Sequence, residues 1–462
     1  MLTFVFALKR LYLLKRRKSS KDIINLIEIY CIFTEKLGLN MEYIERKLYL
    51  QQLIDNRDNG EIKIVTGPRR SGKSWLLKKI FRDYLLSTGV KDANIIVVSL
   101  DADDENSQEE LTERAKLKDY IYKQVKSTSE RYYIFLDEIQ LVDGFEKLVN
   151  GLNAKDNFDV YITGSNSKFL SSDINTIFRG RGVEIRVFPL TFNEFITNRS
   201  ESDSELWKEF YTYGGMPGLL FQKTPTQKAA YLNRLWNKTY IDDCIERNHI
   251  RDKAAFESMV KALCSSIGSL TNPNRIKNVL QSNLHVNLSL DTIQGYLEAL
   301  EQAYLFEGAE RFNIKGNKYY GSIKKYYSVD VGLRNAKLNF RQQEINHIME
   351  NIIYTELRAR GFMVDVGVIE GRVQKDGKSE YVQYEVDFIA TNGMRKCYIQ
   401  SAFEMASSEK SEQEKRSLKK IDDSFLKIVV VGSDIAPYTD ENGFLITGII
   451  DFLKTGADKL LR

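Results

Sequence analysis

Residues Gly67 to Ser74 have the residue types and spacing that bind phosphate groups. The stretch reads GPRRSGKS, so two glycines five residues apart are followed by Lys73 and Ser74. Glycines let such a loop curl until backbone N–H groups face phosphate oxygens, and the following helix adds its positive dipole end. Lys73 is predicted to contact the β- and γ-phosphates, and the Ser74 hydroxyl to bind Mg²⁺. The residues expected to bind ATP are Gly67, Pro68, Arg69, Arg70, Ser71, Gly72, Lys73, Ser74 and Trp75.

A second motif, YYIFLDEIQ (132–140), ends a β-rich run with two carboxylates. Ligands of open α/β sheets bind at the carboxyl ends of the strands. Asp137 is therefore predicted to hold Mg²⁺, and Glu138 to polarise a water for attack on the γ-phosphate. An isolated acidic pair of this kind more often caps the next helix. Together with the phosphate loop, the pair favours ATP hydrolysis.

Two further stretches carry polar side chains that could reach the nucleotide. Thr163-Gly-Ser-Asn166 follows a third β-rich run, and Asn166, or else Ser165, is predicted to sense the γ-phosphate. A plain turn is the alternative, because these residue types favour turns. FRGRG (178–182) contains Arg181 and Arg179, either of which could act as an arginine finger in a neighbouring subunit. A basic turn without a catalytic role is equally consistent with that stretch.

The elements that must position these residues follow an α/β pattern. Helical patterns separate short β-branched runs, which indicates a buried parallel sheet with covering helices. The strand that ends in TGSN is expected to lie between the phosphate-loop strand and the acidic strand. The predicted strands are 62–66, 95–101, 132–138, 158–166 and 183–191.

Composition limits the remaining possibilities. The chain has 462 residues, enough for two or three domains, and its net charge of +4 says little about nucleic acid. Four scattered cysteines and three histidines argue against a disulfide framework or a metal cluster, and favour the cytoplasm. No apolar stretch is long enough to span a membrane. Residues 1–40 are expected to form a disordered or dispensable extension, with a peripheral basic anchor as the alternative.

The motifs GPRRSGKS, LDEIQ, TGSN, GRG, FPLTFNEF (188–195) and GGMP (214–217) resemble those of a family of prokaryotic AAA+-type P-loop ATPases. In that family a winged-helix segment and a C-terminal domain of unknown function, related to PD-(D/E)xK nucleases, follow the ATPase domain. The resemblance implies ATP and Mg²⁺ as cofactors and leaves the substrate open. The domains it implies are an ATPase domain with a small helical lid over 41–245, a winged helix over 246–335 and a nuclease-like domain over 336–462.

The middle region is predicted to form two helices and a β-hairpin. Residues 271–306 read as helix, turn, helix and strand, with Ser289 or Asp291 capping the second helix, and 311–330 as a hairpin turning at Gly316. The exposed face of the second helix carries no basic residue, so packing or partner binding is favoured over sequence-specific DNA reading. That face carries Gln294, Glu298, Glu301 and Gln302, and the lysines expected near DNA phosphates are Lys315, Lys318, Lys324 and Lys325.

The C-terminal region has the sequence layout of the resembled nucleases but lacks residues that their catalytic site needs. Glu350, or else Glu356, and Asp387 fit two metal-binding places, but Gln400 and Ala402 stand where the resembled nucleases need Glu and Lys. An amide is a poor ligand for a hard cation, so the domain is predicted to be inactive. The predicted function is an ATP-driven switch or motor that acts on nucleic acid or protein, and a homo-oligomer is one assembly compatible with it. The alternatives are an ATP-gated nuclease and a non-hydrolysing nucleotide-binding scaffold.

Overall fold

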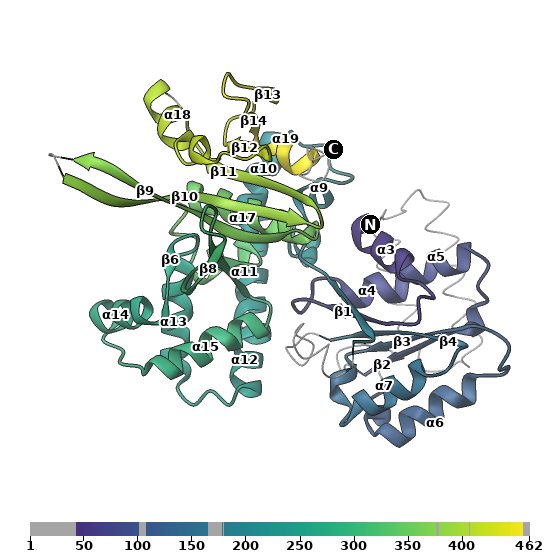
Figure 1. The fold of residues 1–462 in the computed structure, drawn as a ribbon. Coiled ribbons are helices and arrows are strands. Elements are labelled where there is room, and N and C mark those ends of the chain that lie inside the picture. The colour runs from purple at the N-terminus through teal and green to yellow at the C-terminus, as the bar shows by residue number, and fades with distance from the viewer. Residues whose placement is uncertain are drawn as a thin grey trace, which may run out of the picture. The chain divides into compact units, whose positions relative to one another are not determined.

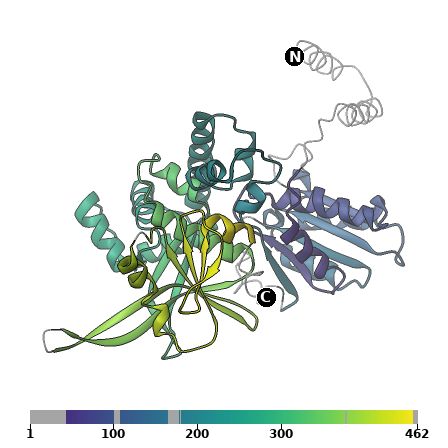
Figure 2. The same cartoon turned by 90° about the horizontal axis from the view of Figure 1, so that it is seen from above.

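The computed structural model describes residues 43–100, 108–164, 178, 180–375, 378–405 and 407–455. The chain forms two units, residues 1–45 and 46–462, and all elements named below belong to the second (Figures 1 and 2). The predictions for residues 1–40, Ser165, Asn166 and Arg179 lie outside the described residues. Within the described ranges, no helix combines the length and apolar character needed to cross a bilayer.

The first sheet is the predicted parallel α/β sheet. Its strand order is β2-β3-β4-β1-β5, and all neighbouring strands pair in parallel. As predicted, the strand that ends in Thr163 lies between the phosphate-loop strand and the acidic strand. The strands are β1 (Ile62–Thr66), β2 (Ile95–Ser99), β3 (Tyr132–Asp137), β4 (Phe158–Thr163) and β5 (Gly182–Arg186).

Helices cover both faces of this sheet (Figure 1). Because side chains alternate along a strand, Ile62 and Ile64 of β1 pack into one core while Val65 packs into the other. The first core includes α6 (Arg114–Gln124) and α7 (Phe145–Asn153). The second includes α3 (Lys47–Asp55) and one helical run made of α4 (Lys73–Trp75), a π-helical segment η1 (Leu76–Phe81) and α5 (Arg82–Ser87).

A helical region follows the first sheet. Its buried residues form one apolar cluster from Met216 to Leu338, so the predicted boundary at 245/246 falls within a shared core. The Ser289 hydroxyl caps α15 by accepting a hydrogen bond from Thr292 N–H, as predicted. The helices are α9 (Phe192–Phe195), α10 (Asp203–Tyr213), η6 (Pro217–Phe221), α11 (Pro225–Arg234), η7 (Leu235–Ile241), α12 (Asp242–Arg247), α13 (Lys253–Ser265), α14 (Pro273–Leu284), α15 (Leu290–Gln302) and α16 (Val331–Lys337).

The second sheet has nine strands in the order β13-β14-β12-β11-β10-β9-β7-β8-β6. The predicted hairpin, β7 (Phe306–Asn313) and β8 (Lys318–Ser328), is part of it, because β7 pairs in parallel with β9. The hairpin of β9 and β10 extends beyond the rest of the sheet (Figures 1 and 2). The other elements are β6 (Leu270–Thr271), α17 (Ile345–Ala359), β9 (Met363–Lys375), β10 (Lys378–Asn392), β11 (Arg395–Ala402), α18 (Ser408–Lys415), β12 (Leu426–Val431), β13 (Tyr438–Thr439), β14 (Leu445–Gly448) and α19 (Ile449–Thr455).

One prediction for the β7–β8 hairpin is wrong. Lys325 is only 4% exposed and pairs with Glu350 of α17, so it is not available to DNA phosphates. Lys324, its neighbour on the opposite face of β8, is partly exposed and lies 3.4 Å from a Glu310 carboxylate oxygen. The strand is not a free wing, because β6 and β7 flank it and α17 packs on it.

Candidate nucleotide site

The phosphate loop lies at the carboxyl end of β1, and its backbone depends on glycine. Gly67 and Gly72 have φ of 133° and 99°, which side chains other than glycine rarely adopt. A Cβ on Gly67 would lie 2.1 Å from the Val187 carbonyl oxygen. The loop is therefore packed directly against the chain that leaves β5.

Side chains from two distant segments hold the outer carbonyls of the loop. The buried guanidinium of Arg46 donates to Ser71 O at 3.2 Å and to Phe188 O at 2.6 Å. Tyr240 of η7 donates its hydroxyl proton to Arg69 O at 2.7 Å. These contacts fix the curl of the loop before any ligand is present, which is the preorganisation that an anion site requires.

Lys73 points back into the loop. Its ammonium donates to Gly67 O and Pro68 O, both at 3.0 Å, and the residue is 4% exposed. Burial lowers the pKa of Lys73, and the nearby Glu138 and Asp137 carboxylates oppose that effect. An anion in the loop would give this buried ammonium a charged partner in place of two neutral carbonyls.

Asp137 and Ser74 are brought together as predicted. The Ser74 hydroxyl donates to Asp137 Oδ1 at 2.9 Å, and Thr163 at the end of β4 donates to the same oxygen at 2.5 Å. The other oxygen of this carboxylate has a cationic partner, since Lys78 Nζ lies 2.5 Å from Asp137 Oδ2. Hydroxyl and carboxylate oxygens are the donors that suit Mg²⁺, so these two residues fit the ion.

Glu138 is held in an unusual backbone conformation beside this group. Its φ and ψ of 55° and 44° are left-handed, and its N–H donates to Thr163 Oγ1 at 2.9 Å. The Gln140 amide donates to the Glu138 carboxylate. Strained backbone of this kind persists where the surroundings fix it, often at functional sites. The Thr163 hydroxyl thus contacts both the carboxylate of Asp137, which is predicted to hold Mg²⁺, and the backbone of Glu138, the predicted base.

The other predicted residues occupy different places. Trp75 is 53% exposed on the helix after the loop. Arg181 is exposed and directly precedes β5, where Ile62 of β1 pairs with Gly182. That is the amino edge of the sheet, opposite the phosphate loop, so Arg181 lies far from the site on its own chain. This position excludes contact with a nucleotide in the phosphate loop of the same chain, and it is compatible with a basic turn or with a role toward another molecule.

A chain of backbone contacts leads from the loop to the second sheet. Val187 N–H donates to Thr66 O at 2.8 Å, and Leu190 N–H donates to Gly215 O at 2.7 Å. Gly215 N–H in turn donates to Asp330 Oδ2 at 2.8 Å. The sequence motifs FPLT and GGMP thus meet Asp330, the N-cap of α16.

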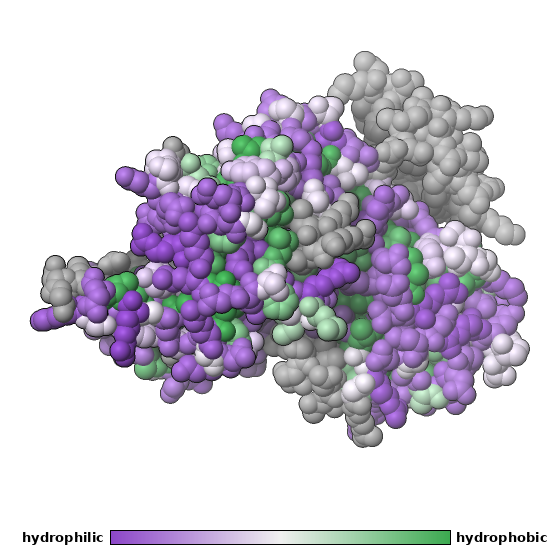
Figure 3. All heavy atoms as spheres, turned by 45° about the horizontal axis from the view of Figure 1, so that its top comes forward, coloured by the Kyte–Doolittle hydropathy of each residue, from purple (hydrophilic) through white to green (hydrophobic). Residues whose placement is uncertain are grey.

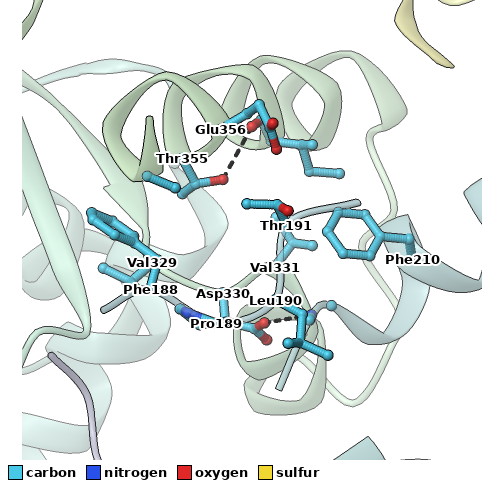
Figure 4. Close-up of a pocket in the computed structure, with 14 residues that line it drawn as sticks. Phe188, Pro189, Leu190, Thr191, Phe210, Val329, Asp330, Val331, Thr355 and Glu356 are labelled. Atoms are coloured by element: carbon cyan, nitrogen blue, oxygen red, sulfur yellow. Dashed lines mark hydrogen bonds between the residues drawn. The ribbon is translucent and has the colours of Figure 1, made fainter. Parts of the chain in front are cut away.

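These segments surround a small cavity (Figure 4). The side chains of Thr355 and Glu356, from α17, form one wall, and Asp330 lies with Pro189 on the opposite wall. The volume of about 30 Å³ leaves room for one or two waters, so this is a packing junction and not a nucleotide site.

We expect Asp330 to make stability depend on pH. Burial raises its pKa from 3.8 to about 6, although backbone N–H groups of Leu333, Gly215 and Gly332 act in the opposite direction. The contribution of Asp330 to the free energy of unfolding is complete below pH 4 and is lost as the pH rises through 6, because its carboxyl group binds a proton more tightly in the folded state than in the unfolded state. The loss should reach about 3 kcal/mol, from about 1.4 kcal/mol per pKa unit.

The measurement is urea unfolding of the wild type and of Asp330→Asn at several values of pH. The difference in unfolding free energy between the two proteins should shrink or change sign between pH 4 and pH 7. A difference that stays constant over this range would contradict the prediction.

The predicted nuclease residues Glu350 and Asp387 also meet, but around a lysine. Lys325 Nζ lies 2.9 Å from Glu350 Oε1, 2.7 Å from Glu385 Oε1 and 3.5 Å from Asp387 Oδ1. Burial and the Glu350 charge raise the pKa of Asp387 to about 8. Glu356, the alternative to Glu350, pairs with Arg360 instead. Within the described ranges, no group of three or more His, Cys, Asp or Glu side chains is arranged to hold a metal ion.

Several residues of the site had no predicted role. Thr163 is the first residue of the TGSN stretch, and its position as a polar residue at the end of a buried strand, beside the acidic strand, could have indicated its contact with Asp137. Lys78 had a helical signal, since it follows Ser74 by four residues. Arg46 and Tyr240 are 25 or more residues from the loop carbonyls they hold, and no local pattern indicates them.

Comparison with known proteins identifies the class of the first sheet and its helices. Residues 59–196 match the family model of an AAA domain, and residues 204–344 match a domain of unknown function, DUF8612. The first match covers the phosphate loop, the acidic strand and Thr163. The chain therefore contains an AAA domain of P-loop type.

Relatives extend over nearly the whole chain. An uncharacterized protein of Haemophilus influenzae is 34% identical over 415 residues, which cover 89% of this chain and 98% of the relative. The uncharacterized protein MJ1544 of Methanocaldococcus jannaschii is 29% identical over 440 residues, 92% of each. The structure of the Aeropyrum pernix ORC1 protein in complex with DNA has 12% identity and a TM-score of 0.27, and the match covers 65% of this chain and 95% of that one. The chain belongs to the same protein family as the Haemophilus protein.

Proposed function

We propose that this protein binds ATP with Mg²⁺ and hydrolyses it, as a nucleotide-driven switch or motor that acts on a nucleic-acid or protein partner. One observation carries the proposal. Thr163 donates to Asp137 at 2.5 Å and accepts from Glu138 N–H at 2.9 Å, so a metal carboxylate and a base are fixed together beside the phosphate loop. A scaffold that only binds nucleotide has no use for the second carboxylate.

Each residue has a separate task in this proposal. Lys73 would leave the carbonyls of Gly67 and Pro68 and pair with the terminal phosphates. Ser74 and Asp137 would hold Mg²⁺, which when bound offsets the charge of those phosphates. Glu138 would accept a proton from the attacking water. The hydrogen bond from the Gln140 amide would orient the Glu138 carboxylate before the attacking water binds.

The experiment compares ATP hydrolysis alone with hydrolysis in the presence of single-stranded DNA, duplex DNA and RNA. Size-exclusion chromatography with and without nucleotide gives the oligomeric state. A basal Mg²⁺-dependent rate supports the proposal, and stimulation by one polymer indicates the partner. A protein that binds no Mg²⁺·ATP would refute it.

We expect Arg181 to work across a subunit boundary. It lies at the sheet edge opposite its own phosphate loop, so any contact with a nucleotide would have to be with one bound by a neighbouring subunit. Arg181→Ala and Lys73→Ala should each be inactive, and their mixture should regain part of the activity because one subunit supplies the loop and the other the arginine. The rate per subunit should also rise with protein concentration. A strict monomer with a concentration-independent rate would exclude this role.

A nuclease function receives less support. The described carboxylates that would hold its metal already surround the Lys325 ammonium, and Gln400 and Ala402 bring no charge to them. We infer that the C-terminal region is an assembly or recognition module. DNA cleavage in Mg²⁺ or Mn²⁺ that survives Lys73→Ala but is lost in Asp387→Ala would reverse this inference.

A further inference from the structure

Asp137 has a cationic partner from its own chain. Its side chain is 5% exposed, and its Oδ2 lies 2.5 Å from Lys78 Nζ. Lys78 also donates to the Ser99 hydroxyl at the end of β2. The carboxylate assigned to Mg²⁺ is therefore paired with an ammonium of its own chain.

The helix after the phosphate loop carries two adjacent lysines, and the first of them, Lys78, contacts the Asp137 carboxylate. Lys78 lies in the π-helical segment η1 (76–81), and its side chain is 22% exposed. Lys79 is 46% exposed and pairs with Asp83 on the outer face of the same helix. A π-helical segment changes which side chains share a helix face and is often found at functional sites.

The position of Lys78 conflicts with that of a bound divalent ion. Ser74 Oγ lies 2.9 Å from the other oxygen of Asp137, so an ion held by these two residues would come close to the ammonium. Two cations beside one buried carboxylate repel each other strongly in a site with little water. The ammonium must move away, or its contact with Asp137 must weaken, before the ion is held.

We propose that Lys78 is a positioning residue that occupies the cation's place beside Asp137 in the nucleotide-free protein and opposes the loading of Mg²⁺ until the phosphates of a nucleotide attract its ammonium away. The inference rests on the proposed ATP site. Under this proposal Mg²⁺ and nucleotide bind together, because the two displace the Lys78 ammonium from Asp137 more effectively than either does alone.

The test is the Mg²⁺ dependence of binding of a fluorescent ATP analogue, measured with the full chain. Lys78→Met should lower the Mg²⁺ concentration for half-maximal binding by about threefold or more, since competing charge is removed. Lys79→Met, the matched control, should leave it at the wild-type value. Lys78→Gln keeps a donor for Ser99 and serves as a second variant should Lys78→Met fail to fold.

Thermal unfolding supplies a readout that is independent of binding. Without ligand, Lys78→Met should melt below the wild type, because Asp137 loses its ion pair, and the gap should narrow with Mg²⁺ and the analogue. An unchanged or higher Mg²⁺ requirement in both Lys78 variants would overturn the role of Lys78 and leave the proposed function standing. A wild type that binds no analogue at any Mg²⁺ concentration would overturn both.

Discussion

Glu138→Gln should bind Mg²⁺·ATP like the wild type while its rate of hydrolysis falls by about 10²-fold or more, the usual cost of losing a general base. The substitution is nearly isosteric, and the Gln140 amide can still donate to the new side-chain oxygen. Its backbone N–H still reaches Thr163. Binding and hydrolysis should therefore separate in this variant.

Lys73→Ala should behave differently and abolish binding itself. The side chain is a buried cation that contacts the loop carbonyls, and in the proposed function it is the group that pairs with the terminal phosphates. Equilibrium binding of a fluorescent ATP analogue and steady-state phosphate release distinguish the two variants. Asp143→Asn, an exposed substitution five residues beyond Glu138, is the control and should leave both quantities unchanged. Wild-type turnover in Glu138→Gln would end the assignment of the base.

The first sheet was predictable because its strands are rich in β-branched and other apolar residues. A buried parallel strand needs β-branched and apolar residues on both faces, and the run IIVVS of β2 offers little else. The phosphate loop was predictable because its glycines and Lys73 are fixed by local geometry. The strands end two to five residues earlier than predicted at β2, β4 and β5.

The partners of the site were less predictable because they depend on long side chains and on tertiary contacts. Helical spacing from Ser74 favours Lys78 over Lys79 on the side of the site, but the contact of its long side chain with Asp137 of β3 is a tertiary contact that no local pattern marks. Lys325 was misassigned for a related reason. Successive residues of β8 point to opposite faces, and only the packing of α17 determines which face is buried.

The position of Lys325 leads to the other large effect. Lys325→Met should destabilise the C-terminal region by about 3–5 kcal/mol, the range for breaking a buried ion pair by removing one partner. The residue is 4% exposed, so water cannot replace the ammonium. Three carboxylates would then remain together, of which Glu350 retains a hydrogen bond from Tyr327 at 2.7 Å and Asp387 one from Ser401 N–H at 2.8 Å. Such neutral donors do not offset the charges of Glu350 and Glu385, while Asp387 is largely protonated near pH 7 because burial raises its pKa to about 8.

Urea unfolding of Lys325→Met beside Lys324→Met tests this expectation. Lys324 is the adjacent, partly exposed lysine whose ion pair with Glu310 spans 3.4 Å, so its loss should cost less than about 1 kcal/mol. Neutralising the carboxylates in Lys325→Met/Glu350→Gln/Asp387→Asn should recover much of the stability, because the buried repulsion is removed together with the ammonium. If Lys325→Met were as stable as Lys324→Met, the carboxylates would have another source of neutralisation. The inference that the Lys325 ammonium neutralises these buried carboxylates would then fail.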